Sequence, residues 1–229
     1  MRQIEVRISP NYGERRDKMT TQGFGIALAP DNASRDLILK LHECLFALLP
    51  LSFRLGPDNE PHLTLLQIYG PNLSQVMTAT KCLTSSLDAT ALDMKGISFV
   101  KPAWWFLDIE LSPNLRNMHT ALFNMLGPEL SGPVSPDQNK ISHFTPLERK
   151  NFLNYGYRFI GDAYNPHVTL GRSPTPDIDE KSILDALDAN LKSMSSVLTF
   201  NKVLLFSLCL LYTSPSPRDQ RGSRMPSSA

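Results

Sequence analysis

Cysteine is scarce in this sequence: three occur among 229 residues, far apart at positions 44, 82 and 209. Such scattered thiols exclude a disulfide-stapled scaffold and a cysteine-based zinc site, and they favour a reducing, cytoplasmic location. No apolar run reaches the roughly 18 residues of a membrane span, and the first 22 residues lack the apolar stretch of a signal peptide. We therefore expect a cytoplasmic protein without membrane contact.

Recognisable nucleotide and metal motifs are also missing. The sequence contains no glycine-rich phosphate loop, no cluster with metal-ligand spacing and no nucleophile elbow. Their absence argues against ATP-driven nucleotidyl transfer, and we expect no cofactor and no metal. A net charge of +1 does not favour binding to duplex nucleic acid, whereas binding of small or single-stranded phosphate ligands is still possible.

The composition is that of a folded protein, with 41% apolar and 20% charged residues. Residues 23–208 are expected to form the domain, and residues 1–22 a flexible N-terminal extension in which alternating apolar residues are compatible with a short strand. Residues 209–229 are rich in Ser, Pro and Arg and predict a disordered tail. This tail resembles read-through into a sequencing adapter; a basic RNA-binding tail is the alternative.

Hydrophobic periodicity predicts alternating strands and helices across the domain. Strands are expected at 24–29, 61–69, 94–100, 104–111, 166–170 and 197–208, and helices at 32–50, 73–87, 114–126 and 177–192. The stretch 127–164 breaks the pattern and is expected to be a long loop, functional or mobile. The order of elements indicates an α+β fold. On the helices, Leu48, Met125 and both Cys44 and Cys82 are expected to face the core.

One local pattern occurs twice. Residues 61–65 read PHLTL and residues 166–170 read PHVTL, so each half of the domain supplies one copy, 105 residues apart. A single His-x-Thr carries little information, but two copies that agree at four of five positions are unlike a chance repeat. Because residues i and i+2 of a strand share a face, each histidine is expected to lie on the same face as its threonine.

Two imidazoles and two hydroxyls on one surface suit a phosphodiester. Histidine titrates near neutrality, so one ring can be neutral and the other protonated. The neutral ring would remove a proton from the attacking oxygen, and the protonated ring would give one to the leaving oxygen. Threonine hydroxyls and a nearby cation would hold the non-bridging oxygens. The alternative for these residues is purely structural: hydrogen-bonded strand histidines and the β propensity of threonine.

The paired PHLTL and PHVTL resemble the motifs of the 2H phosphoesterases, and more narrowly those of the bacterial 2′-5′ RNA ligase and cyclic phosphodiesterase branch. The resemblance implies two pseudo-symmetric lobes of antiparallel-rich sheet, with outer helices around a central groove. It implies that His62 and His167 are catalytic and that Thr64 and Thr169 bind phosphate. The substrate would be an RNA end or nucleotide with a 2′,3′-cyclic or 2′-5′ phosphate, and the protein a monomer.

Further candidates lie near the second motif. Arg172 follows it directly, as in the RNA ligase branch, and its guanidinium suits phosphate. Trp104, Trp105 and Tyr164 are candidates for the nucleotide pocket, although strand alternation turns one of the tryptophans inward. The first motif is followed by Leu66 and Gln67, a departure from relatives with a basic or aromatic residue there.

The three remaining histidines are expected to have no catalytic role. His42 falls on the surface or edge of a predicted helix and His119 on another predicted helix, both as structural residues; His143 lies in the predicted loop. Two functions compete for the domain as a whole. It is either a metal-independent phosphodiesterase, or a catalytically silent module that binds RNA ends or nucleotides on the same fold.

Overall fold

The fold is mixed, with an antiparallel sheet and flanking helices, which confirms the α+β expectation. The computed structural model describes residues 4–7, 23–70, 72–133, 138–174 and 178–208. Most of the expected extension and the whole of the expected tail lie outside these residues. The strands are β1 (Ile4–Arg7), β2 (Gly23–Pro30), β3 (Leu63–Tyr69), β4 (Thr90–Val100), β5 (Trp104–Ile109), β6 (His167–Arg172) and β7 (Val197–Leu208).

The strands form one sheet in the order β1-β7-β2-β3-β6-β5-β4, and an additional β7–β4 pairing links the two ends of the six larger strands. Every pairing is antiparallel except that of β1, which runs parallel to β7 at the edge. The strand that the N-terminal alternation suggested is therefore present. The two motif strands, β3 and β6, are neighbours at the centre of the sheet.

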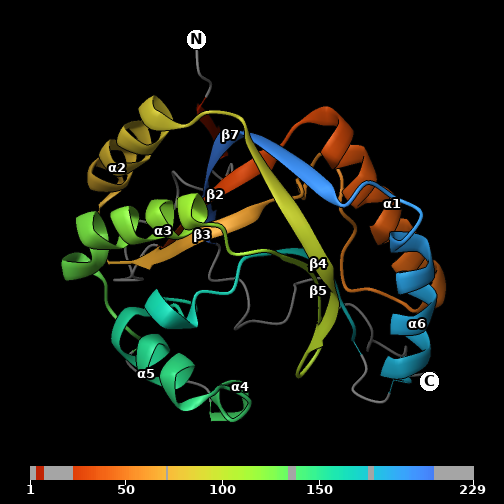
Figure 1. The fold of residues 1–229 in the computed structure, drawn as a ribbon. Helices are drawn as coiled ribbons and strands as arrows, with labels where there is room; N and C mark the ends of the chain where they lie inside the picture. Colours follow the sequence, from red (N-terminus) through yellow and green to blue (C-terminus); the bar gives the residue numbers. More distant parts are fainter. Residues whose placement is uncertain (1–3, 8–22, 71, 134–137, 175–177, 209–229) are drawn as a thin grey trace, which may run out of the picture.

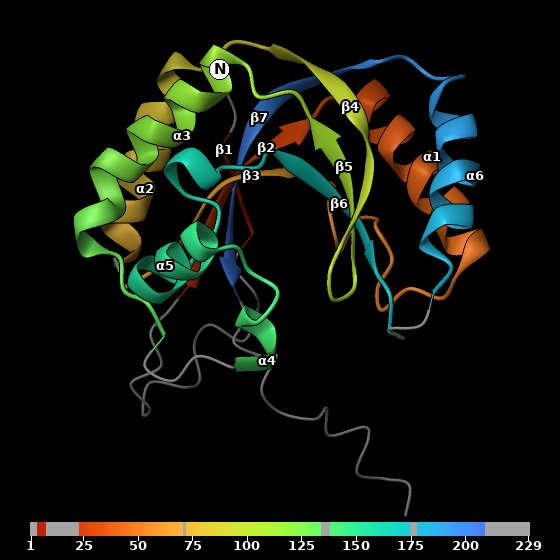
Figure 2. The same cartoon turned by 60° about the horizontal axis from the view of Figure 1, so that its bottom comes forward.

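Four longer helices form two packed pairs, one to the left and one to the right of the strands in the views of Figures 1 and 2. Helix α1 (Asn32–Leu48) packs against α6 (Glu180–Leu191), and α2 (Leu73–Ser86) packs against α3 (Pro113–Leu126). Each begins at a side chain that accepts a hydrogen bond from the backbone of the first turn, as helix N-caps do. These caps are Asp31, Asn72, Ser112 and Asp179.

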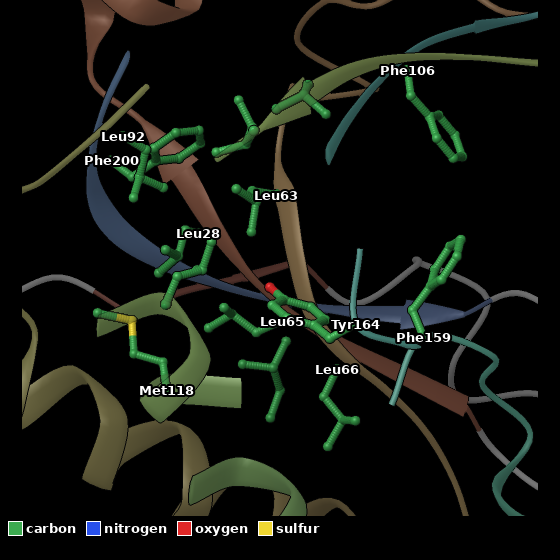
Figure 3. Close-up of a cluster of buried hydrophobic side chains, with 14 of the residues drawn as sticks. Leu28, Leu63, Leu65, Leu66, Leu92, Phe106, Met118, Phe159, Tyr164 and Phe200 are labelled. Atoms are coloured by element: carbon green, nitrogen blue, oxygen red, sulfur yellow. The ribbon is translucent and has the colours of Figure 1, made fainter. Parts of the chain in front are cut away.

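The core joins the buried face of the sheet to these helices in one continuous cluster. Figure 3 shows its centre, where Leu63, Leu65 and Leu66 of β3 lie among side chains from several other elements. All three are fully buried. Because the apolar residues of β3 are taken up by this core, its remaining side chains must point to the opposite face.

The segment 127–164 is not the loop that we expected. It contains the short helix α4 (Gln138–Ile141), the longer α5 (Pro146–Tyr155) and two 3-10 turns, η2 (Gly127–Glu129) and η3 (Gly161–Ala163). A capping box starts α5: the Thr145 hydroxyl accepts from the Glu148 amide, and the Glu148 carboxylate accepts from the Thr145 amide. Gly156 ends it in the left-handed conformation that favours glycine.

Three helix residues that we expected to face the core are exposed. Leu48 and Met125 are 47% and 44% accessible, because each lies in the last turn of its helix, beyond the packed surface. Cys82 is also exposed, whereas Cys44 packs against the core. Within the described ranges, no helix has the length and apolar character needed to cross a bilayer.

Candidate active site

The two motifs meet in the sheet. Leu63 of β3 lies opposite Val168 of β6 in an antiparallel pair, and both are fully buried against the helices. The residues on either side of such a pair point to the other face. His62 and Thr64 therefore share one face with His167 and Thr169, and all four are partly buried there. The structure thus brings these four predicted site residues together.

Both motif histidines are anchored in the same way. Nδ1 of His62 lies 2.8 Å from the backbone oxygen of Glu60, and Nδ1 of His167 lies 2.7 Å from that of Asn165. A carbonyl only accepts, so Nδ1 must donate, and in the neutral ring the proton is on Nδ1. Nε2 is then the basic nitrogen. Within the described part of the chain, Nε2 of neither ring has a hydrogen-bond partner.

The proline of each motif sits between the histidine and the carbonyl that anchors it. Proline fixes its own backbone angle and biases the preceding residue toward an extended conformation. In both motifs the carbonyl two residues before the histidine turns back onto Nδ1. The repeated Pro-His pair therefore sets the tautomer as well as the direction of the ring.

Phenyl rings cover both imidazoles. Phe106 of β5 stacks on His167 with the ring centres 3.7 Å apart, and Phe159 meets the same ring edge-on at 5.4 Å. Phe206 of β7 packs against His62 at 4.9 Å. Its ring lies over Gly25 of the neighbouring strand, where a β-carbon would clash with it. These rings remove water from one side of each imidazole.

Burial dominates the electrostatics of the two histidines, because it disfavours the charged imidazolium. It lowers the pKa of His62, and it lowers the pKa of His167 to about 4 against the opposing effect of the Asn165 carbonyl. Positive charge on Arg158 and on His62 lowers the pKa of His167 further. Both rings are consequently neutral at pH 7 in the free protein, and His167 is the harder one to protonate.

Arg158 comes from the segment that we expected to be a loop. Its guanidinium lies over the Phe159 ring, 4.2 Å from the centre, and pairs with the Glu148 carboxylate at 3.6 Å. Both side chains are largely buried. On the other flank of His167, Asp108 is its neighbour across the β5–β6 ladder, and burial raises the pKa of this carboxyl.

Each motif strand contains a bulge at the same place. Ala27 pairs with Thr64 and Ile26 with Leu66, so Leu65 is skipped in the β2–β3 register. In the β5–β6 register, Phe106 pairs with Thr169 and Trp105 with Gly171, so Leu170 is skipped. A bulge inserts one residue and shifts the phase of the strand after it. Both skipped leucines are the fifth residue of the repeat.

The phase shift decides where the next side chains point. After the bulges, two successive buried residues are followed by a partly buried one, in both strands: Leu65, Leu66 and Gln67, and Leu170, Gly171 and Arg172. Plain alternation would have turned Gln67 and Arg172 into the core. The bulge instead returns both to the face that carries the histidines and threonines.

Arg172 is suited to hold an anion. Its Nε is buried and has no hydrogen-bond partner in the described part of the protein, and its guanidinium lies 5.5 Å from the Trp104 ring. Buried polar groups are nearly always hydrogen-bonded, so an unpartnered one invites a ligand. The sequence-predicted Arg172 and Trp104 are therefore close to each other, on the β5–β6 side of the face.

Two candidates for the nucleotide pocket lie in the core instead. Trp105 is fully buried and its Nε1 donates to the Ser173 hydroxyl at 2.8 Å, because alternation turns it away from Trp104. Tyr164 is 5% exposed and its hydroxyl donates to the Thr64 backbone oxygen at 3.2 Å. Both rings therefore lie in the core and not on the face that carries the histidines.

Sequence reasoning also placed His42 incorrectly and missed several residues near the site. His42 is fully buried rather than at a surface or edge, and His119 is 1% exposed. Phe106, Phe206 and Arg158 were not predicted, and Gln67 was noted only as a departure from relatives. The break in alternation after each motif, LL at 65–66 and LG at 170–171, indicates a bulge. Among the described residues, no cluster of three or more His, Cys, Asp or Glu side chains could hold a metal ion.

Comparison with known proteins does not assign the chain to a family. Neither a family model nor a curated protein matches the sequence. Two solved structures of Usb1 from Kluyveromyces marxianus are similar to the chain, one of them with uridine monophosphate. The first has 15% identity and a TM-score of 0.41 and covers 81% of this chain and 93% of that chain. The second has 18% identity and a TM-score of 0.36 and covers 74% and 80%. Scores and identities this low do not decide the family.

Proposed function

We propose that this protein is a metal-independent phosphodiesterase of the 2H phosphoesterase type, which acts on 2′,3′-cyclic or 2′-5′ phosphates of RNA ends or nucleotides. One observation carries the proposal. Two imidazoles from repeated motifs lie on one face of the sheet, each with Nδ1 anchored to a carbonyl and Nε2 unpartnered among the described residues. Acid–base catalysis at one phosphorus atom requires two such oriented imidazoles, each with a nitrogen free to take up or give a proton.

We assign the role of base to His167 and that of acid to His62, because the imidazolium form is the less accessible one at His167. Arg158 disfavours the imidazolium of His167, so its Nε2 stays free to take a proton from water or from a hydroxyl nucleophile. As the new P–O bond forms and the bond to the leaving oxygen breaks, His62 gives that oxygen its proton. The negative charge of a bound phosphodiester favours the protonated form of His62.

The remaining polar groups of the face would stabilise the phosphate. The hydroxyls of Thr64 and Thr169 would donate to the non-bridging oxygens, and the Arg172 guanidinium would neutralise their charge. Trp104, beside Arg172, is the aromatic residue left to contact a base. No step in this scheme requires a metal ion.

We further infer that the domain consists of two pseudo-symmetric lobes. The pairings support this: β2 pairs with β3 and β7, while β5 pairs in the corresponding way with β6 and β4. The packed helix pairs correspond as well: the pair α1 and α6 in one lobe corresponds to the pair α3 and α2 in the other. The identical position of the two bulges is a third correspondence. The substrate would then lie across the junction of the lobes.

A product assay on 2′,3′-cyclic nucleotides and 2′-5′-linked dinucleotides, with and without EDTA, tests the function. We expect turnover that the chelator does not reduce. His62→Asn and His167→Asn keep a donor near Nδ1 but cannot transfer a proton from Nε2, and each should lower the rate by about 10²–10⁴-fold. His143→Ala, at an exposed histidine, is the matched control. A wild-type rate in either Asn variant contradicts the assignment, and binding without product favours the silent module.

A further inference from the structure

Each bulge takes one buried residue out of the pairing with the neighbouring strand, and a buried histidine contacts the carbonyl of that residue. Leu65 and Leu170 are skipped in the registers to β2 and β5, and buried carbonyls need partners. The Leu65 oxygen lies 2.7 Å from Nδ1 of His119, and the Leu170 oxygen lies 2.7 Å from Nδ1 of His42. Each skipped residue therefore receives a hydrogen bond from a helix rather than from the neighbouring strand.

The second nitrogen of each ring is also used, and in the same way. Nε2 of His119 accepts from the Gly161 amide at 3.0 Å, and Nε2 of His42 accepts from the Leu55 amide at 3.2 Å. A carbonyl on one side and an amide on the other fix the tautomer of both rings with the proton on Nδ1. Each histidine thus ties a bulge to a loop segment through a ring that is almost fully buried.

The connections cross between the halves of the chain. His42 lies on α1, which precedes β3, yet it holds the bulge of β6. His119 lies on α3, which precedes β6, yet it holds the bulge of β3. Tyr164 strengthens the second arrangement: it stacks on His119 with ring centres 4.0 Å apart and donates to the Thr64 oxygen.

We propose that His42 and His119 are paired positioning residues, each holding the bulge that returns a substrate-contacting side chain to the histidine face. His42 acts through Arg172, and His119 acts through Gln67, because these residues follow the two bulges. This role rests on the proposed function. It assigns the two lobes different contributions, since the residue five positions after the catalytic histidine is a cation in one strand and a neutral amide in the other.

A double-mutant cycle on steady-state kinetics with a 2′,3′-cyclic nucleotide tests the role of His42. His42→Leu removes the donor to Leu170, and Arg172→Ala removes the side chain that the bulge presents. We expect each to raise KM on the order of tenfold with a smaller change in kcat, and the double variant to be no worse than either. His42→Asn keeps a donor near Nδ1 and should recover most of the lost affinity.

The second bulge provides the matched control. His119→Leu should be coupled to Gln67→Ala in the same sense, whereas His42→Leu with Gln67→Ala should give additive effects, because they involve different strands. Additive effects for the His42 and Arg172 pair, or equal coupling of His42 to Gln67, would overturn the proposal. So would failure of His42→Asn to recover affinity when His42→Leu loses it.

Amide hydrogen exchange separates this inference from the proposed function. In His42→Leu the Leu55 amide should exchange faster than in the wild type, and in His119→Leu the Gly161 amide should do so. Unchanged exchange at these sites contradicts the positioning role even in an active enzyme. If the wild type neither turns over nor binds phosphodiesters, the proposed function fails, and the exchange measurement still decides whether the histidines hold the bulges. If a Leu variant does not fold, His42→Asn and His119→Asn are measured at the same amides, where loss of the Nε2 acceptor should accelerate exchange.

Discussion

Leu63 and Val168 lie opposite each other where β3 and β6 pair, and both side chains are fully buried. This pair connects the two motif strands directly, so the relative position of the catalytic candidates depends on it. The candidate catalytic side chains lie on one face of the sheet, and the apolar contacts that align them lie on the other face.

Shortening Leu63 should therefore affect stability and activity together. Leu63→Ala leaves a cavity beneath the motif and should lower the free energy of unfolding by about 2–5 kcal/mol, with a fall in kcat as the histidines lose their alignment. Urea unfolding and kinetics on one preparation check this. Leu48→Ala, at a side chain 47% exposed, should change neither; a comparable loss there would mean that the effect is not specific to the pair.

The assignment of His167 as base predicts a shift in the pH–rate profile. Arg158 lowers the pKa of His167, so Arg158→Gln should raise it and move the acidic limb of kcat/KM to higher pH. His62 and Asp108, the other titratable groups beside His167, remain in place. Lys150→Gln removes an exposed charge from α5, the helix that precedes Arg158, and should leave the limb unchanged. A limb that does not move with Arg158→Gln would mean that His167 does not govern it.

Stability should fall as the pH drops below about 6.5. The pKa values of His62, His119 and His167 are all lowered in the folded protein, so below the unfolded value the unfolded chain binds more protons. For His167, with a folded pKa of about 4, the loss accumulates between pH 6.5 and 4 and amounts to on the order of 3 kcal/mol. Urea titrations across this range measure it, and His167→Asn should flatten the curve.

Gly25 leaves room for the Phe206 ring that packs on His62. Gly25→Ala should displace that ring, lower the free energy of unfolding by about 1–3 kcal/mol, and raise the pKa of His62 as water reaches the imidazole. In a Phe206→Ala background the same change should cost nothing, because the clash is gone. Thermal unfolding of the four proteins and NMR titration of His62 provide the readouts; equal costs in both backgrounds would contradict the steric explanation.

Much of this architecture was predictable because local patterns determine it. Alternation and turn residues located six strands, and the repeated PHxTL placed His167 and both threonines on strands, while His62 lies directly before β3. The helix α5 was missed because its apolar pattern is weak, although the capping box at Thr145 and Glu148 was present in the sequence. The pairing of β3 with β6 could not be predicted, since register between distant strands depends on the whole core.

The directions of the side chains that follow the motifs also could not be predicted from the local sequence pattern. Alternation alone would have put Arg172 in the core, and the bulge at Leu170 reverses this. Alternation also left open which of Trp104 and Trp105 points inward, and the hydrogen bond to Ser173 decides it. The burial of His42 follows from contacts with a strand that lies 128 residues further along the chain, which no local pattern reveals.

The crossed histidine connections have a consequence for fragments of this protein. A chain severed in the turn between β4 and β5 would give one piece with α1 but without the strand that His42 serves, and another with α3 but without the strand that His119 serves. Each piece would contain a bulge whose carbonyl lacks its histidine donor until the two pieces associate. Complementation of the two fragments should therefore be all-or-none, and neither should bind a phosphodiester alone.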